Sequence, residues 1–89
     1  MADDPWRLEI HRKAEKEIRR LPKEIIRRVV PAVMSLAVEP RPLGSGSVKG
    51  YNLSKIRVGN YRVIYRIDEQ ERLVIILRVG HRKDVYRNL

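Results

Sequence analysis

The stretch KIRVGNYRVIYR, residues 55–66, limits what this chain can fold into more than any other part of the sequence. Apolar and basic residues alternate on both sides of Gly59-Asn60, and a period of two residues predicts a pair of strands. Glycine and asparagine both tolerate positive φ, so a two-residue loop at this point favours a hairpin whose twist matches that of its strands. The stretch therefore predicts a tight β-hairpin.

The hairpin can gather positive charge on one face of a sheet. Side chains along a strand alternate between its faces, so the basic residues of each strand emerge on the same side. With a suitable register, one patch would hold four cations: Lys55, Arg57, Arg62 and Arg66. Like charges that oppose each other across strands cost stability, so such a patch indicates an anionic partner.

Positive charge is also concentrated in the second half of the chain. The formal net charge is +9; residues 1–39 contain 9 Lys/Arg and 7 Asp/Glu, whereas residues 40–89 contain 11 and 4. No carboxylate occurs from Pro40 through Ile67. Such a basic half indicates a nucleic acid or an acidic protein as partner. The alternative is a charge that serves only solubility, although such surfaces usually mix both signs.

Length and composition exclude several other classes. A chain of 89 residues fits one domain, residues 1–89, and has no cysteine for disulfides or thiolate metal sites. Histidines and carboxylates also lack metal-ligand spacing, so we expect no metal and no other cofactor. The first ten residues do not resemble a signal peptide, and no segment is long enough to span a membrane. We therefore expect a cytoplasmic protein that does not bind membranes.

The hydropathy pattern predicts the order strand, helix, helix, strand, strand, strand. A short strand over residues 6–10 precedes helices over about 11–20 and 22–38, and Pro31 should kink or break the second helix. Residues 43–50, LGSGSVKG, predict a flexible loop, and residues 73–79, LVIILRV, a central strand. We expect an α+β fold, in which a helical hairpin packs on one face of a small antiparallel sheet and leaves the other face free.

The free face would carry basic side chains suited to one kind of reaction: Lys55, Arg57, Arg62 and Arg78. RNA cleavage without a metal needs a group that takes the proton from the 2′-hydroxyl. It also needs cations that stabilise the pentavalent phosphate and an acid for the leaving 5′-oxygen. Arginine stays protonated at ordinary pH, so it can hold phosphate but cannot act as the base.

The residues that follow the last strand would complete this set. His81, Arg82 and Tyr86 would lie at the end of that strand, beside the middle strands. Lys55, His81 or Tyr86 could then act as the base, and the alternative for His81 is a surface histidine without a special role. Tyr86 could stack on a nucleobase or simply pin the tail to the sheet.

The order of elements, the segment VKGYNLSKIRVGNYRVIYR and the ending VGHRKDVY together resemble the RelE branch of the RelE/ParE toxins of bacterial and archaeal toxin-antitoxin pairs. The resemblance covers nearly the whole chain. It implies an endoribonuclease, an mRNA interferase, that enters the decoding site of the ribosome and cuts messenger RNA without a metal. It also implies a RelB-like antitoxin as partner, whose acidic helical segment would complement the basic half.

The resemblance implies roles for individual residues as well. Lys55, Arg62, Arg82 and Tyr86 match site residues of the family, whereas Arg57 replaces a lysine of the best-known members. If that lysine accepts the proton elsewhere, this chain must use Lys55, His81 or Tyr86, or react more slowly. The expected catalytic set is Lys55, Arg57, Arg62, His81, Arg82 and Tyr86. The expected RNA contacts are Lys49, Arg66, Arg78 and Lys83.

Two other functions fit the same residues. A ParE-like protein would inhibit DNA gyrase through protein contacts and have no nuclease activity. That branch generally lacks a full set of catalytic cations, whereas this chain retains most of it. The third possibility is a basic module that only binds nucleic acid, in which loss of any single cation would weaken binding by a similar amount.

Overall fold

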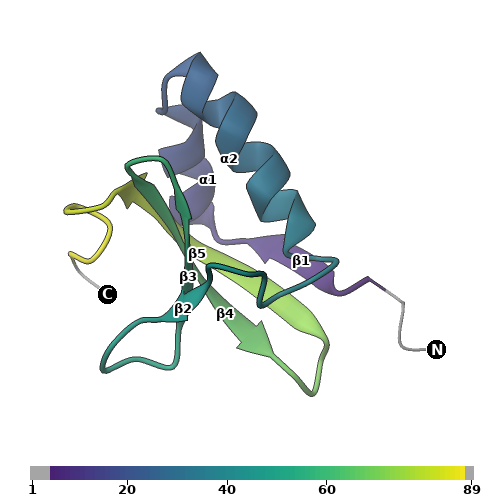
Figure 1. Cartoon of the computed structure of the whole chain (residues 1–89). Coiled ribbons are helices and arrows are strands. Elements are labelled where there is room, and N and C mark those ends of the chain that lie inside the picture. Colours follow the sequence, from purple (N-terminus) through teal and green to yellow (C-terminus); the bar gives the residue numbers. More distant parts are fainter. Residues whose placement is uncertain (1–4, 88–89) are drawn as a thin grey trace.

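The computed structural model describes residues 5–87, which form two helices and a five-stranded sheet (Figure 1). In chain order the elements are β1 (Arg7–Ile10), α1 (Arg12–Arg19), α2 (Lys23–Ser35), β2 (Gly46–Ser47), β3 (Ser54–Val58), β4 (Tyr61–Asp68) and β5 (Leu73–His81). The order of strands across the sheet is β1-β5-β4-β3-β2. Within the described residues, neither helix has the length and apolar character needed to cross a membrane.

The predicted α+β fold is confirmed, but the sheet is mixed rather than antiparallel. β1 pairs with β5 in parallel, whereas the other three pairs of neighbouring strands are antiparallel. Parallel pairing requires a long connection between the two strands, and here two helices and three strands intervene. β5 has neighbours on both sides, as predicted for an apolar strand of this kind.

Both predicted helices are present, with small differences at their ends. α1 begins after His11, whose Nδ1 accepts a hydrogen bond from the Lys13 backbone N–H at 3.1 Å. α2 continues through Pro31 without a break, so of the two predicted alternatives only the kink stays a prediction. Pro31 lies on the exposed side of α2, where water can satisfy the carbonyl group that lacks a backbone donor. The helix ends at Ser35 and is followed by a turn.

The two helices cover one face of the sheet and enclose the main hydrophobic core (Figure 1). Tyr65 of β4 is fully buried there, and its hydroxyl donates a 2.7 Å hydrogen bond to the Pro40 carbonyl. Burial raises the pKa of Tyr65 above its ordinary value of 10.0. The other buried members of this core are Ala14, Val29, Val33, Leu36, Ile56, Val58, Val63, Val74, Ile76 and Val79.

The opposite face, which we call the second face, is not free as predicted. Val48, Ile64 and Val85 are buried on it with Leu53 packed against them, and we call this group the small core. The predicted flexible loop takes part in the fold: it contains β2, which pairs with β3, and the Val48 backbone N–H donates to the Leu53 carbonyl at 3.0 Å. A strand of two residues rich in Gly and Ser carries little sequence signal, which explains why it was not predicted.

The predicted hairpin is confirmed, with its turn at Gly59-Asn60. Val58 pairs with Tyr61 and Arg57 with Arg62, and the φ of Gly59 is +60°. Asn60 does not adopt positive φ. A two-residue hairpin turn with positive φ only at its first central residue is the type that requires glycine there.

Arg78 lies at an edge of the sheet and is engaged in structural contacts. β1 pairs with β5 only as far as Ile76, so the backbone of β5 beyond it needs another partner. Glu17 of α1 accepts hydrogen bonds from the Val79 backbone N–H at 3.0 Å and from the Arg78 guanidinium at 3.0–3.2 Å. The Arg78 side chain is only 12% exposed and also donates to the Arg87 carbonyl. Arg78 pairs with Ile64 and so lies on the second face as predicted, but Glu17 already engages its guanidinium group. Its expected contact with RNA stays a prediction.

Loss of the Glu17 carboxylate should destabilise the fold. We expect Glu17→Ala to lower the free energy of unfolding by about 2 kcal/mol, because it removes charged hydrogen bonds and leaves Arg78 unpaired. Glu15→Ala is the matched control, since Glu15 forms an exposed ion pair with Arg19 on the same helix, of a type worth about 0.3–0.5 kcal/mol. Urea unfolding of both variants measures the difference, and equal losses would contradict this role for Glu17.

Tyr65 should also contribute a pH-dependent part of the stability. In the unfolded chain its hydroxyl ionises near its ordinary pKa, whereas burial keeps it neutral in the fold. This contribution is fully present below about pH 10 and is lost as pH rises through the raised pKa. We expect Tyr65→Phe to cost about 1–3 kcal/mol at neutral pH, because the Pro40 carbonyl loses its donor. In urea unfolding, the difference in the free energy of unfolding between wild type and Tyr65→Phe should shrink above pH 10. A difference that stays constant with pH would contradict the raised pKa of Tyr65.

Candidate functional site

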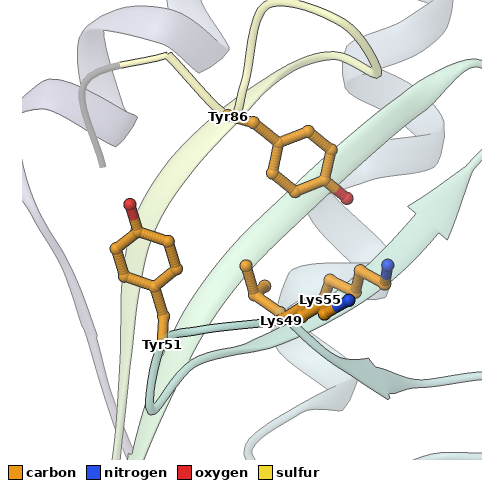
Figure 2. A pocket seen from close by; sticks show the side chains of 5 residues that line it. Lys49, Tyr51, Lys55 and Tyr86 are labelled. Atoms are coloured by element: carbon orange, nitrogen blue, oxygen red, sulfur yellow. The ribbon is translucent and has the colours of Figure 1, made fainter.

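A pocket on the second face brings together basic and aromatic side chains (Figure 2). Its volume is about 380 Å³, and its lining is formed by Val48, Lys49, Tyr51, Lys55 and Tyr86. These residues come from the segment before β3, from β3 itself and from the turn that follows β5. We call this hollow the Lys55–Tyr86 pocket.

The small core determines where the walls of this pocket lie. Val48 is buried in that core, so its neighbour Lys49 is held at the rim. Val85 is buried there as well, and Tyr86 follows it. Lys55 lies directly opposite Ile64 in the β3–β4 register, on the same face. Three separate segments are thus fixed against one another by a few apolar side chains.

Lys55 and Tyr86 interact directly within the pocket. The Lys55 Nζ lies 5.9 Å from the centroid of the Tyr86 ring. This distance is at the outer limit of a cation–π interaction, in which the electron-rich ring face attracts the ammonium group. The contact places an amine that can carry a proton beside an aromatic ring that is 36% exposed.

Arginines extend the positive charge of the second face toward the hairpin turn. Arg57 and Arg62 lie directly opposite each other across β3 and β4, on the same face as Lys55. Within residues 5–87, no carboxylate lies within 4.0 Å of the charged groups of six of the eight lysines and arginines predicted for the site. They are Lys49, Lys55, Arg57, Arg62, Arg82 and Lys83. Like charges kept together without counter-charges favour an anionic ligand.

His81 lies where the sequence predicts, at the end of β5 beside a middle strand, because it pairs with Tyr61 of β4. The pairing puts it in phase with the main core on the helix-covered face, and the two rings meet edge to face at 5.8 Å. Arg78, three residues earlier on β5, pairs with Ile64 on the second face, and side chains an odd number of positions apart lie on opposite faces of a strand. His81 therefore does not join the cations of the second face.

The remaining predicted cations do not line this pocket and lie at other points along the sheet. The Arg82 backbone N–H donates to the Asn60 carbonyl at 2.9 Å, which fixes Arg82 beside the hairpin turn. Lys83 is exposed in the turn after β5. Arg66 lies farther along β4 and forms a 4.0 Å ion pair with Asp68. Arg57 also lines a second hollow of about 420 Å³ next to α2.

Val48 and Tyr51 line the pocket but were not among the predicted site residues, and Tyr51 is the one that can contact a ligand through a ring. Its side chain is 52% exposed and lines the hollow together with Tyr86. The available signal was an aromatic residue within a carboxylate-free stretch, two positions after Lys49. A single tyrosine between Gly50 and Asn52 has no periodic context, so the hydropathy pattern could not reveal its position.

The pocket has the features of a site for a nucleotide within a single-stranded nucleic acid. Its volume falls in the range of about 300–1,000 Å³ that is usual for ligand pockets. Lysine and arginine can bind phosphate, and exposed tyrosine rings can stack on unpaired bases. Among residues 5–87, no three His, Asp or Glu side chains are grouped as metal ligands would be.

The sequence profile of the family described as "ParE toxin of type II toxin-antitoxin system, parDE" matches residues 8–86. The chain therefore belongs to the RelE/ParE superfamily of type II toxin-antitoxin toxins, and its relatives place it in the RelE branch. This result confirms the resemblance found in the hairpin and the tail.

Two crystal structures and one curated relative illustrate the similarity. Toxin RelG of Mycobacterium tuberculosis is 35% identical over 85 residues, which cover 93% of this chain and 98% of that toxin. A chain of the toxin-antitoxin complex RelBE2 from the same organism superposes with a TM-score of 0.77 at 31% identity, covering 88% of this chain and 99% of that chain. For the archaeal RelE-RelB complex from Pyrococcus horikoshii OT3, the TM-score is 0.78 and the identity 29%, with 90% and 98% covered.

Removal of the pocket lysines should change the salt dependence of nucleic-acid binding. For a single-stranded oligonucleotide, we expect Lys49→Ala and Lys55→Ala each to reduce the slope of log K against log salt concentration by about 0.7. Lys16→Ala, on the exposed side of α1, is the control and should leave the slope unchanged. Fluorescence anisotropy over a salt series measures these slopes. Equal effects of all three substitutions would mean that binding is spread over the whole surface.

Proposed function

We propose that this protein is the toxin of a type II toxin-antitoxin pair and an endoribonuclease that cleaves messenger RNA on the ribosome. The observation that carries the proposal is the contact of Lys55 with Tyr86, on the sheet face that also holds Arg57 and Arg62. Within residues 5–87, neither arginine has a carboxylate within 4.0 Å of its guanidinium. This arrangement supplies a proton-transfer group, an aromatic platform and phosphate ligands within one short stretch of surface.

In the proposed reaction, the 2′-oxygen of one nucleotide attacks the adjacent phosphorus. The proton of the 2′-hydroxyl passes to a base, the bond from phosphorus to the 5′-oxygen breaks, and an acid protonates that oxygen. The products are a 2′,3′-cyclic phosphate and a 5′-hydroxyl. Arg57, Arg62 and Arg82 stabilise the extra negative charge on the phosphate, because guanidinium groups bind it in fixed geometry without releasing a proton.

Lys55 and Tyr86 are the proposed proton-transfer groups, since both line the pocket and both can exchange a proton. His81 takes no direct part in this proposal, because its ring packs against Tyr61 on the other face of the sheet. Lys49 and Lys83 would hold the RNA backbone on either side. The arginine at position 57 then serves as a phosphate ligand and not as the base.

A RelB-like antitoxin is the proposed protein partner. The similar chains from M. tuberculosis and P. horikoshii were both crystallised in complexes of this kind, as the names RelBE2 and RelE-RelB state. The carboxylate-free stretch from Pro40 through Ile67 would attract an acidic segment of such a partner before contact. The same surface would attract RNA, so the two ligands would compete for it.

The cleavage assay uses a translated message, purified protein and primer extension, with ribosomes present or absent. We expect wild-type protein to cut at codon positions only when ribosomes are present. Arg62→Ala should cut about 100-fold more slowly or worse, because it removes one stabilising donor from the transition state. Arg27→Ala removes an exposed arginine from α2 and serves as the charge-matched control, which should cut at the wild-type rate.

The other outcomes separate the remaining functions. If Arg62→Ala and Arg82→Ala both cut as fast as wild type, the proposed site is wrong. If wild-type protein makes no cut but inhibits supercoiling by purified gyrase, the ParE-like function replaces the proposed one. Cuts in RNA without ribosomes would indicate a nuclease that acts on its own.

A further inference from the structure

We propose that Tyr51 is a second base-contacting residue, which forms with Tyr86 a two-sided aromatic slot for one unpaired nucleobase. The inference rests on the proposed function and adds to it a residue that positions the RNA. It concerns binding, since Tyr51 supplies a ring face and no group that the cleavage reaction requires. Lys49 would hold a phosphate next to that base.

The two tyrosines reach the same hollow from different parts of the chain. Tyr51 belongs to the turn before β3, and Tyr86 to the turn after β5. Figure 2 shows Tyr51 on one side of the hollow and Tyr86 on the other, with the two lysines along its base. Both tyrosines therefore border the space that a flat ring would enter.

The backbone holds Tyr51 in this position. Its N–H donates to the Val48 carbonyl at 3.1 Å, which closes a turn that starts in the small core. Gly50 has a φ of +85°, a conformation that side chains disfavour, and no atom within 4 Å would meet a Cβ there. Glycine is thus needed for the path of the turn and not for close packing, and that path places Tyr51 at the pocket.

Packing does not explain why a tyrosine occupies this position. The Tyr51 side chain is 52% exposed and does not belong to the small core of Val48, Ile64 and Val85. Among the described residues, no hydrogen bond from its hydroxyl is found. A large ring that is half exposed to water is better explained by contact with a ligand than by packing within the protein. The two lysines beside it, Lys49 and Lys55, have no carboxylate partner among the described residues, which favours an anionic ligand.

The chemistry of the slot points to a base in single-stranded RNA. Every nucleobase has an aromatic face, and a base within a duplex is covered by its neighbours and cannot enter such a slot. Stacking on one aromatic side chain contributes about 1–3 kcal/mol per base, which corresponds to an increase in affinity of about 5- to 150-fold. We expect Tyr51 to raise affinity for RNA more than it raises the rate of cleavage of bound RNA.

The binding test uses a short single-stranded RNA that carries one 2-aminopurine, whose fluorescence falls when it stacks. Tyr51→Leu removes the ring at similar size, and Tyr51→Phe is the matched control that keeps the ring and removes the hydroxyl. We expect Tyr51→Phe to bind and quench like wild type. Tyr51→Leu should bind about tenfold more weakly and lose at least half of the quenching. Thermal unfolding checks that both variants are folded, which the exposure of the side chain predicts.

A cleavage test with ribosomes distinguishes failure of the slot from failure of the proposed function. If wild-type protein cuts, Tyr51→Leu should raise KM about tenfold with a smaller change in kcat, and Tyr51→Phe should change neither. Unchanged KM and quenching in Tyr51→Leu would overturn the slot and leave the nuclease function intact. If wild-type protein does not cut, the proposed function fails, and lost quenching in Tyr51→Leu still supports the slot.

Discussion

β4 is the strand on which the rest of the structure depends, because it contributes to the cores on both faces of the sheet. Val63 and Tyr65 are buried under the helices, while Ile64 between them is buried in the small core. A shift of one residue in its pairing would move Arg62 into the main core, which would be very unfavourable. The register of β4 is thus strongly fixed. Because the hairpin turn pairs β3 with β4, the same register fixes the sheet face on which Lys55 and Arg57 lie.

The small core connects the fold to the site. Lys49 and Tyr86 each follow a buried member of the small core, and Lys55 is the strand partner of a third. Tyr51 is linked to the same core by a backbone hydrogen bond to the Val48 carbonyl. The main core under the helices supports the sheet but supplies no residue that lines the pocket. The helices therefore provide stability, whereas a few aliphatic residues on the other face determine how closely the lysines and tyrosines approach each other.

The sequence predicted those features that depend on local periodicity. Alternation around Gly59-Asn60 was sufficient for the hairpin and for Lys55, Arg57 and Arg62 on one face, and helical spacing was sufficient for both helices. Features set by tertiary context were not predictable. The parallel pairing of β1 depends on a distant part of the chain. His81 and Arg78 are an odd number of residues apart on β5, so only one of them can join the cations of the second face. No local pattern indicates that Glu17 would lie at the strand edge and engage Arg78.

The shortness of β2 has a consequence for how copies of this protein behave at high concentration. β2 pairs only with Ser54 and Lys55, so among residues 5–87 the outer edge of β3 from Ile56 to Val58 has no strand partner. Unpaired edges of this kind can recruit another chain and begin aggregation. Here the open edge is three residues long and Arg57 is at its centre, on a chain with a net charge of +9. Repulsion between such edges opposes strand-to-strand association and favours a protein that stays dispersed in solution.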